Sequence, residues 1–443
     1  MILRLSSPAV RWAYLLISAA VAVGLGYFSL RNAWAEHQAD PQEAAGLERA
    51  TKLEPGNAHH WYLLGRYWQY NLEQPDTARA IALYQRALSL EPHAAGIWLD
   101  LAESQEAEGE LKAAREAFLE ARTNYPVSAD VAWRYGNFLL RQGETDAAFA
   151  EIQRSLAEEP RRAAEAISVC WRAKPDIRVL LDQALPASPQ VYLSVIEVFA
   201  QQWETDAALA VWRRLAGLRP KLELKQVNIL VDALLAKRQV AEAREVWTQA
   251  LDFAGAPRPG DPAKSLIWDG GFETGVSGGF AWRLQAAQGA QMDFDSEVRH
   301  SGNRALRIRF DGKQNPQFEN VCQFVAVTPE TPYQLEAWMR AKSVTTDRGV
   351  YVLVRTPEFP TNPPAMTVDM RETQPWTRLA LSWTAGKDVH LAQVCLGRAI
   401  SQKLDNQISG TVWVDDFTLT PESAPRAASP AASPAEAAAK ERP

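Results

Sequence analysis

The hydrophobic pattern of this chain begins with one long uncharged run. Between Arg11 and Arg31 lie 19 residues without a charge, Trp12 to Leu30. A helix rises about 1.5 Å per residue, so the run spans roughly 28 Å, close to the hydrocarbon thickness of a bilayer. The pattern therefore predicts one transmembrane helix over residues 12–30.

The charges around this run predict its orientation. Arg4 and Arg11 precede it, whereas Arg31 is followed by Glu36 and Asp40. Positively charged flanks stay on the cytoplasmic side of a membrane. We therefore expect a single-pass protein of the inner (cytoplasmic) membrane, with its N-terminus inside and the bulk of the chain periplasmic or otherwise extracytoplasmic.

Two alternatives to an anchor remain open at this point. The run could be a buried helix of a soluble domain. It could also be a cleavable signal, because Ala33-Trp34-Ala35 fits the small-residue cleavage pattern, although the run exceeds the usual signal core of about 7–15 residues. An anchor and a signal both place the rest of the chain outside the cytoplasm, and cleavage after Ala35 is left undecided.

Beyond residue 40 the hydrophobic positions recur with a fixed period. Pro92, Pro126 and Pro160 are spaced 34 residues apart. The places before the last two carry matching residues: Trp98, Leu101, Ala102, Gly109, Ala114, Phe118 and Ala121, then Ala132, Tyr135, Gly136, Gly143, Ala148, Ile152 and Ser155. Before Pro92 the same pattern occurs with a three-residue insertion near Glu73–Pro75.

This pattern resembles the tetratricopeptide repeat. Small residues at the crossing points let two antiparallel helices pack closely, and a proline ends the second helix. Residues 44–55 are similar to the second helix of an incomplete first repeat, and weaker copies follow residue 186. About six such units over residues 41–255 predict an α-solenoid.

The resemblance implies a protein or peptide partner in the groove of the solenoid. The large aromatic residues of the repeats are expected in its core. Residues on the first helices that do not match the repeat pattern are candidates for partner contact: Tyr67, Gln69, Asp100, Gln105, Arg134 and Asn137.

After a linker rich in proline and glycine, the period changes to two. Ten short strands separated by turn residues predict an antiparallel β-sandwich. The expected strands are 265–272, 281–284, 290–294, 304–310, 321–327, 333–341, 350–355, 377–383, 390–397 and 411–420.

Short motifs in this region carry a second resemblance. They are Asp269-Gly270-Gly271-Phe272-Glu273, the segment His300–Leu306, the run Pro332–Trp338, and Val412–Phe417. Their order is similar to the galactose-binding-like jelly roll of many carbohydrate-binding modules. The resemblance implies a jelly roll that binds a polysaccharide or glycan.

The jelly-roll resemblance also implies a structural calcium ion joining the first and last strands. It places Glu273 and Asp416 as carboxylate ligands, with backbone oxygens near Gly271 and the His300 turn. Calcium takes six to eight oxygen ligands, which suits such a set. The alternative is that Asp415 and Asp416 only cap a terminal strand. No cofactor beyond this ion is expected.

Strand alternation selects candidate sugar contacts. Aromatic rings stack on the C–H face of a sugar while amide, carboxylate and guanidinium groups bind its hydroxyls. The expected contacts are Gln323, Glu336, Trp338, Tyr351, Arg355 and Gln393, with interlayer packing as the alternative for Trp338. If Gln323 and Gln393 line one cleft, Cys322 points into the core and Cys395 does not, which argues against a disulfide between them.

Composition excludes few further functions. The net charge is −6, so nucleic acid is not expected as a partner. No nucleophile elbow, zinc-protease motif or phosphate-binding loop is present, so we expect no enzyme activity. The remaining alternatives are a structural interaction protein whose sandwich binds no sugar, and a polysaccharide-active enzyme.

Together these patterns predict a multidomain chain, α followed by β, acting as a membrane-anchored scaffold in envelope polysaccharide or exopolysaccharide assembly. Its expected parts are a cytoplasmic N-terminus (1–11), a transmembrane helix (12–30), a tetratricopeptide-like solenoid (41–255), a linker (256–264), a jelly roll (265–420) and a disordered tail (421–443).

Overall fold

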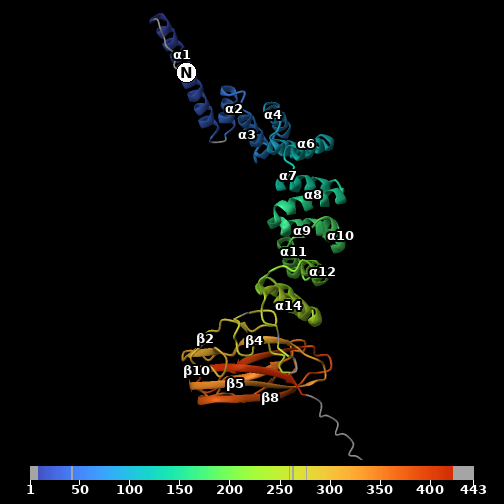
Figure 1. Ribbon diagram of the computed structural model, residues 1–443, viewed down its shortest axis with the longest axis vertical. Coiled ribbons are helices and arrows are strands. Elements are labelled where there is room, and N and C mark those ends of the chain that lie inside the picture. The colour runs from blue at the N-terminus through green and yellow to red at the C-terminus, as the bar shows by residue number, and fades with distance from the viewer. Residues whose placement is uncertain (1–7, 41–42, 259, 262–263, 276, 423–443) are drawn as a thin grey trace, which may run out of the picture. The chain divides into compact units, whose positions relative to one another are not determined.

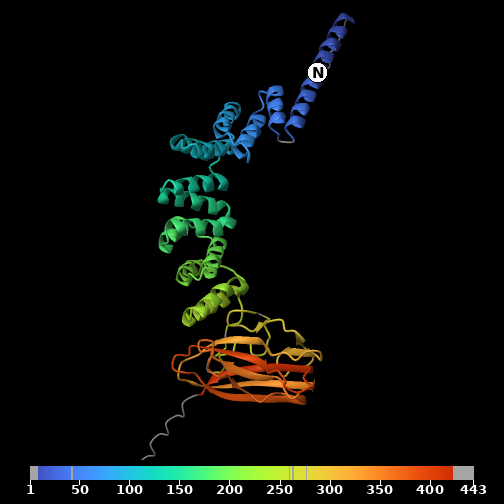
Figure 2. The same cartoon turned by 180° about the vertical axis from the view of Figure 1, so that it is seen from behind.

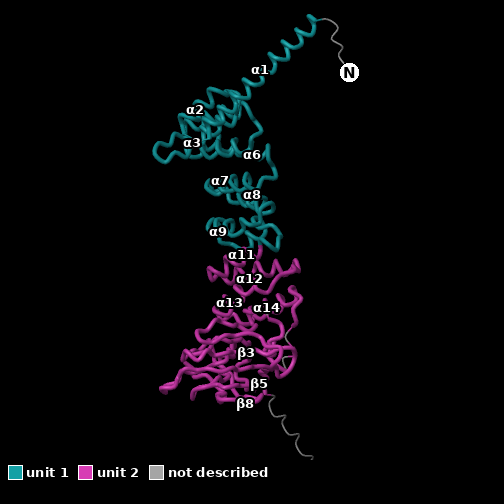
Figure 3. The backbone as a smooth tube through the Cα atoms, turned by 90° about the vertical axis from the view of Figure 1, so that its left-hand side faces the viewer, with its two compact units in different colours: residues 1–191 teal, residues 192–443 magenta. Residues whose placement is uncertain are grey.

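The computed structural model describes residues 8–40, 43–258, 260–261, 264–275 and 277–422. The predicted tail from residue 423 onward, the first seven residues and three residues of the expected linker lie outside these ranges. The chain divides into two compact units, residues 1–191 and 192–443 (Figure 3). Each unit is described by itself.

The first unit consists of helices that follow one another as hairpins (Figure 1). They are α1 (Pro8–Ala39), α2 (Ala44–Leu53), α3 (Ala58–Tyr70), α4 (Thr77–Leu90), α5 (Ala95–Ala107), α6 (Leu111–Asn124), α7 (Ala129–Arg141), α8 (Thr145–Glu158), η1 (Pro160–Arg162), α9 (Ala163–Ala173) and α10 (Ile177–Gln183).

The residues of the 34-residue period make the contacts within these hairpins. A Cβ on Gly65 of α3 would lie 2.6 Å from Cε1 of Tyr84 on α4, so the tyrosine ring packs where only glycine fits. In the next repeats the Phe118 ring lies against Tyr135 and Phe138, with ring centroids 5.5 and 5.0 Å away. Small residues therefore admit the neighbouring helix, as the repeat pattern predicts.

Helix α1 is longer than the predicted span of 12–30. Among the described residues it is the one helix that is long and apolar enough to cross a membrane, judged by length and composition. Its apolar side chains between residues 12 and 30 are exposed, with Trp12 and Leu30 67% and 75% accessible.

The second unit begins with two further helical hairpins and continues into the sandwich (Figure 2). The helices are α11 (Pro189–Gln201), which starts at the end of the first unit, α12 (Thr205–Gly217), η2 (Leu224–Gln226), α13 (Asn228–Ala236) and α14 (Val240–Ala254). The strands are β1 (Arg283–Leu284), β2 (Ala290–Asp295), β3 (Ala305–Asp311), β4 (Phe318–Ala326), β5 (Pro332–Val344), β6 (Tyr351–Arg355), β7 (Ala365–Met366), β8 (Glu372–Thr384), β9 (Leu391–Arg398) and β10 (Ser409–Pro421).

These strands form two antiparallel five-stranded sheets. We call the sheet with strand order β1-β4-β9-β6-β7 sheet A and the one with order β2-β3-β10-β5-β8 sheet B. The apolar alternation predicted for β5 is confirmed, since Tyr333, Leu335 and Met339 are buried in the core between the sheets. Val352 and Val354 of β6, in sheet A, pack into the same core.

One strand prediction was wrong, and one strand was not predicted. Residues 265–272 form turns rather than a strand, because Asp269 and Phe272 have positive φ and the Asp269 carboxylate accepts hydrogen bonds from the Glu273 and Thr274 amides. Strand β7 was not predicted, since two residues are too short to show alternation. The predicted fold class is confirmed: a long apolar helix, helical repeats, and an antiparallel sandwich.

Candidate functional site

A polar cluster lies on the outer face of sheet A, the face turned away from the core. Arg355 of β6 donates from Nε to Gln393 Oε1 at 2.7 Å and from Nη1 to Glu319 Oε2 at 2.6 Å. Gln393 of β9 faces Arg355 directly in the strand register. The side chain of Arg355 is 41% exposed and that of Glu319 is 31% exposed, so both reach solvent.

Tyr351 extends this cluster along β6. A Cβ on Gly397 would lie 2.5 Å from Cε2 of Tyr351, so the ring lies on the glycine opposite it in the register. Burial and then the nearby Glu319 carboxylate raise the pKa of Tyr351. The hydroxyl therefore stays protonated at neutral pH and can donate a hydrogen bond.

We name Glu319, Tyr351, Arg355 and Gln393 the Arg355 cluster. It brings together three of the six predicted sugar contacts and adds Glu319. Alternation did not reveal Glu319, because a register shift between Phe318 and Val321 interrupts the β4 ladder there. Together the four side chains present a guanidinium, an amide, a carboxylate and a hydroxyl, the groups that bind vicinal hydroxyls of a sugar.

Gln323 was placed on the wrong face by the sequence. It shares parity with the core residues Val321 and Val325 and is fully buried. Its amide donates to the Trp268 carbonyl at 2.8 Å and accepts from the Trp268 amide at 3.0 Å. Gln323 thus ties the turn before β1 to sheet A and cannot contact a sugar.

Glu336 and Trp338 lie on the outer face of the other sheet. Both belong to β5 of sheet B, so the core separates them from the Arg355 cluster. Glu336 is paired with Arg378, and the Trp338 ring stacks on His300 with centroids 4.0 Å apart. The six predicted sugar contacts therefore do not lie on one surface.

The prediction that Cys322 and Cys395 do not meet was also wrong. They are register partners on β4 and β9, their Cα atoms are 4.1 Å apart, and they form a disulfide. Both side chains lie on the outer face of sheet A, beside Leu353. The error followed from Gln323: once Gln323 is turned inward, both cysteines point outward.

The corner expected to hold calcium is closed by hydrogen bonds. Glu273 accepts from the backbone amides of Asn303 and Arg304, at 2.7 and 3.4 Å. Asp416 accepts from His300 Nδ1 at 2.6 Å and from the Ser301 hydroxyl at 2.7 Å. The carboxylates of Glu273 and Asp416, which the resemblance assigns as calcium ligands, thus accept hydrogen bonds from N–H and O–H groups of the protein.

Asp415 completes this corner. It is fully buried and accepts from the His300 and Ser301 amides at 2.8 and 3.1 Å, and burial raises its pKa. Gly271 lies nearby: a Cβ on Gly271 would lie 3.5 Å from Asp415 Oδ1. Within the described ranges no group of three or more His, Cys, Asp or Glu side chains could hold a metal ion. The expected ligands Gly271, Glu273 and Asp416 thus lie at one corner, where protein donors contact the two carboxylates.

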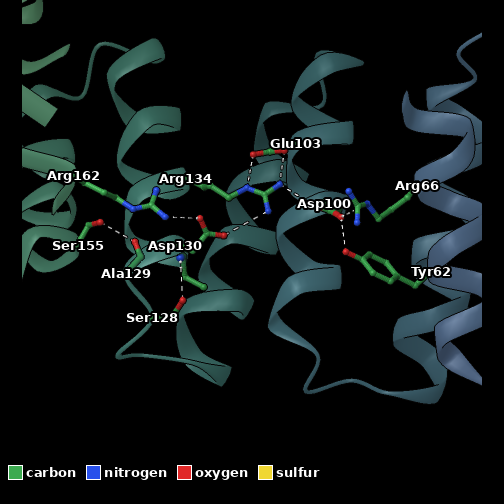
Figure 4. Close-up of polar contacts among 11 residues, drawn as sticks. Tyr62, Arg66, Asp100, Glu103, Ser128, Ala129, Asp130, Arg134, Ser155 and Arg162 are labelled. Carbon is green, nitrogen blue, oxygen red and sulfur yellow. Dashed lines mark hydrogen bonds and ion pairs between the residues drawn. The ribbon is translucent and has the colours of Figure 1, made fainter. Parts of the chain in front are cut away.

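A chain of ion pairs links the repeats of the first unit (Figure 4). Asp100 of α5 accepts from Tyr62 at 2.9 Å and from Arg134 of α7 at 2.7 Å. Arg134 also pairs with Glu103 and, at 3.9 Å, with Asp130. Burial and then Asp100 raise the pKa of Tyr62 to about 12. These contacts join helices one repeat apart.

Several residues expected to be free for a partner are buried or already contact other parts of the chain. Asp100 and Gln105 are 5% and 6% exposed, so their predicted contact with a partner is wrong. Gln69 accepts from the Tyr84 hydroxyl, and Asn137 donates to the Trp133 carbonyl. Arg134 is 20% exposed and is held by carboxylates.

Tyr67 is the predicted groove residue that lines a cavity. The cavity measures about 340 Å³ and is formed by Leu63, Arg66, Tyr67, Tyr70 and Asn71. Arg66, which the sequence did not single out, is half exposed and lies 3.8 Å from Asp100. It therefore presents a guanidinium beside two tyrosine rings.

Within the second unit, the last helical hairpin contacts the sandwich. Arg283 of β1 pairs with Asp232 of α13, and Asn228 donates to the Ser277 carbonyl at 2.9 Å. The Trp247 ring of α14 meets Trp268 edge to face, with centroids 6.1 Å apart. Helix α14 and the sandwich thus share an aromatic contact.

Comparisons with known proteins agree with the helical part of this fold. Tetratricopeptide-repeat family models match residues 71–132 and 109–166. A search of the curated proteins gave no match.

Several solved structures resemble parts of the chain. A family 16 carbohydrate-binding module is 20% identical, with 35% of this chain and 99% of that chain covered and a TM-score of 0.25. TmCBM61, solved in complex with beta-1,4-galactotriose, is 17% identical, with 36% and 99% covered and a TM-score of 0.26. YrrB, a TPR protein with an unusual peptide-binding site, is 15% identical, with 48% and 94% covered and a TM-score of 0.26.

The long apolar helix near the N-terminus and the disulfide are both features of chains that leave the cytoplasm. Residues 71–166 of this chain are tetratricopeptide repeats, and the chain that carries them continues into an antiparallel β-sandwich.

Proposed function

We propose that this protein is a non-catalytic scaffold anchored in the inner membrane, with its bulk in the periplasm. Its helical repeats bind a protein partner, and its sandwich binds carbohydrate in envelope polysaccharide or exopolysaccharide assembly. The observation that carries the sugar half is the Arg355 cluster, which gathers complementary polar groups beside a tyrosine ring on one exposed sheet face.

The repeats support a protein partner. Tetratricopeptide helices stack into a solenoid whose groove is suited to a peptide. The ion pairs already engage Asp100 and Arg134, whereas the cavity around Arg66, Tyr67 and Tyr70 could accept a side chain of the partner. An apolar group with a nearby acceptor would suit its tyrosine rings and guanidinium.

The Arg355 cluster supports a sugar ligand of the sandwich. The hydrogen bonds from Arg355 hold the Gln393 and Glu319 side chains before any ligand arrives. Side chains that are already ordered lose less conformational freedom on binding. The Cys322–Cys395 disulfide on the same face fixes the two strands that carry Glu319 and Gln393.

Affinity gel electrophoresis of the detergent-solubilised full chain, through neutral and acidic polysaccharides, tests the sugar half. We expect retardation by at least one polysaccharide and a loss of affinity of about tenfold in Arg355→Ala or Gln393→Ala, the size of one or two lost hydrogen bonds. Trp338→Ala, on the opposite sheet, is the matched control and should keep its affinity.

Two results would reject this assignment. Retardation that disappears in Trp338→Ala but persists in Arg355→Ala would move the site to sheet B. No retardation in any polysaccharide would remove carbohydrate binding, and a polysaccharide cleaved by the protein would instead favour the enzyme alternative.

A second candidate is favoured by the contact between helix α14 and the sandwich. In this alternative the sandwich only caps the solenoid, covering Trp247 of the last hairpin with Trp268. Asp232→Ala removes the partner of Arg283 and would then lower the melting temperature of the second unit. Adding a glycan to the unmodified protein would leave its melting temperature unchanged. A glycan that raises the melting temperature would contradict a purely structural role.

A further inference from the structure

We infer that the last turns of α1 are the first helix of the first repeat, so that α1 is retained and not cleaved after Ala35. The inference rests on the proposed export of the chain through α1. It decides between the anchor and the signal that the sequence leaves open.

The C-terminal end of α1 differs from its apolar part because it has buried side chains along one face of the helix. Ala35 and Ala39 are 0% and 2% exposed, and Arg31 and Gln38 are partly buried. These positions recur at three- and four-residue steps, as on one face of a helix. Trp34 and Glu36, on either side of Ala35, are exposed. The same helix therefore has an all-round apolar part for lipid and a packed end.

The partner of this buried face is α2. A Cβ on Gly46 of α2 would lie 2.3 Å from the Gln38 carbonyl oxygen, so the two backbones approach as closely as only glycine allows. Close approach through a small residue is how the later hairpins of this chain also pack, as at Gly65 and Gly136.

The packed end of α1 also belongs to the core of the repeats. Ala39 is part of a buried cluster with Leu47 and Ala50 of α2 and Leu64 of α3. The end of α1 is therefore the first helix of the repeat whose second helix is α2, and this first repeat is complete. Leu63 and Tyr67 pack against the same cluster and also line the groove cavity, so the first partner cavity is built next to the anchor.

Cleavage after Ala35 is incompatible with this packing. The Ala33-Trp34-Ala35 segment lies within a continuous helix, and Ala35 has no exposed surface. Removal of residues up to Ala35 would also take away the packed turn that carries Arg31 and Ala35, and only one short helical turn with Gln38 and Ala39 would remain beside α2.

Cysteine accessibility in the full-length protein tests the inference. Ala35→Cys and Glu36→Cys are made separately and treated with a membrane-impermeant maleimide on spheroplasts. The native cysteines give little background, because Cys170 is buried and the other two are bridged. We expect Glu36→Cys to react and Ala35→Cys to react about tenfold more slowly, because a buried thiol reacts only after local opening.

Two glycine variants provide a matched pair. Gly46→Ala should raise the reaction rate of Ala35→Cys, since the new methyl group collides with the Gln38 carbonyl. Gly56→Ala should leave it unchanged, because nothing lies within 4 Å of a Cβ there. An intact-mass measurement should show that residues 1–35 remain attached.

Equal reaction of Ala35→Cys and Glu36→Cys, or a mature chain that begins at Glu36, overturns the inference. Reaction of Glu36→Cys only after lysis overturns the proposed function instead, because the chain then lies inside the cell. The ratio of the two rates after lysis still decides whether α1 packs on α2.

Discussion

Cys322 and Cys395 stand directly opposite each other on β4 and β9, and their disulfide lies on the outer face of the sheet that carries the Arg355 cluster. The bridge joins two neighbouring inner strands of that sheet, β4 and the central strand β9. It therefore connects the position of Glu319 to that of Gln393.

The bridge should stabilise the sandwich strongly. It closes a loop between residues 73 apart in sequence, so replacing both cysteines with alanine should cost roughly 2–5 kcal/mol of unfolding free energy. Chemical denaturation of the full chain measures this. Thiol titration in denaturant should find one free thiol before reduction and three after it; three before reduction would show that the bridge does not form.

Acid should weaken the sandwich through Asp295. Burial by itself raises its pKa, but hydrogen bonds from Trp413, Val298 and Glu297, with Arg307 nearby, outweigh burial and lower the pKa from 3.8 to about 2. The folded state thus binds this proton less tightly than the unfolded state. The stabilisation is present above about pH 4 and is lost as the pH falls toward 2.

The Asp295→Asn variant isolates this effect. At pH 7 its free energy of unfolding should be about 3 kcal/mol lower, because Arg307 and the Trp413 indole lose a buried charged partner. Its stability should also fall less between pH 4 and pH 2. A variant with an unchanged pH profile would exclude Asp295 as the group responsible.

Calcium should not stabilise the protein. Protein donors already bind the carboxylates of Glu273, Asp415 and Asp416, and a cation would have to displace them. We expect the same melting temperature in calcium and in EDTA. A rise of several degrees with calcium, lost in Glu273→Gln, would contradict this expectation and support the calcium implied by the resemblance.

The repeat network should depend on Arg134. Arg134→Ala leaves Asp100 buried with only Tyr62 and the more distant Arg66, so we expect a loss of about 2 kcal/mol in the unfolding of the repeats. Arg161→Ala is the control, because that side chain is 82% exposed and its solvent-screened ion pair with Glu159 should contribute little to stability. Equal losses would mean that the groove network is not important for stability.

The local patterns of the sequence determined the elements of this fold. The 34-residue period predicted the hairpins, because the packing of Gly65 against Tyr84 is decided by two residues at fixed spacing. Alternation separated the inward Tyr333, Leu335 and Met339 of β5 from the outward Glu336 and Trp338.

Only the tertiary structure decided which outward residues meet. Alternation gives two faces for each strand but does not say which face is inward or which sheet a strand joins. Gln323 was turned the wrong way for the first reason, and for the second reason alternation could not show that Trp338 lies on the other sheet from Arg355 and Gln393. The strand register, which joins residues far apart in sequence, brought Cys322 to Cys395 and Arg355 to Gln393.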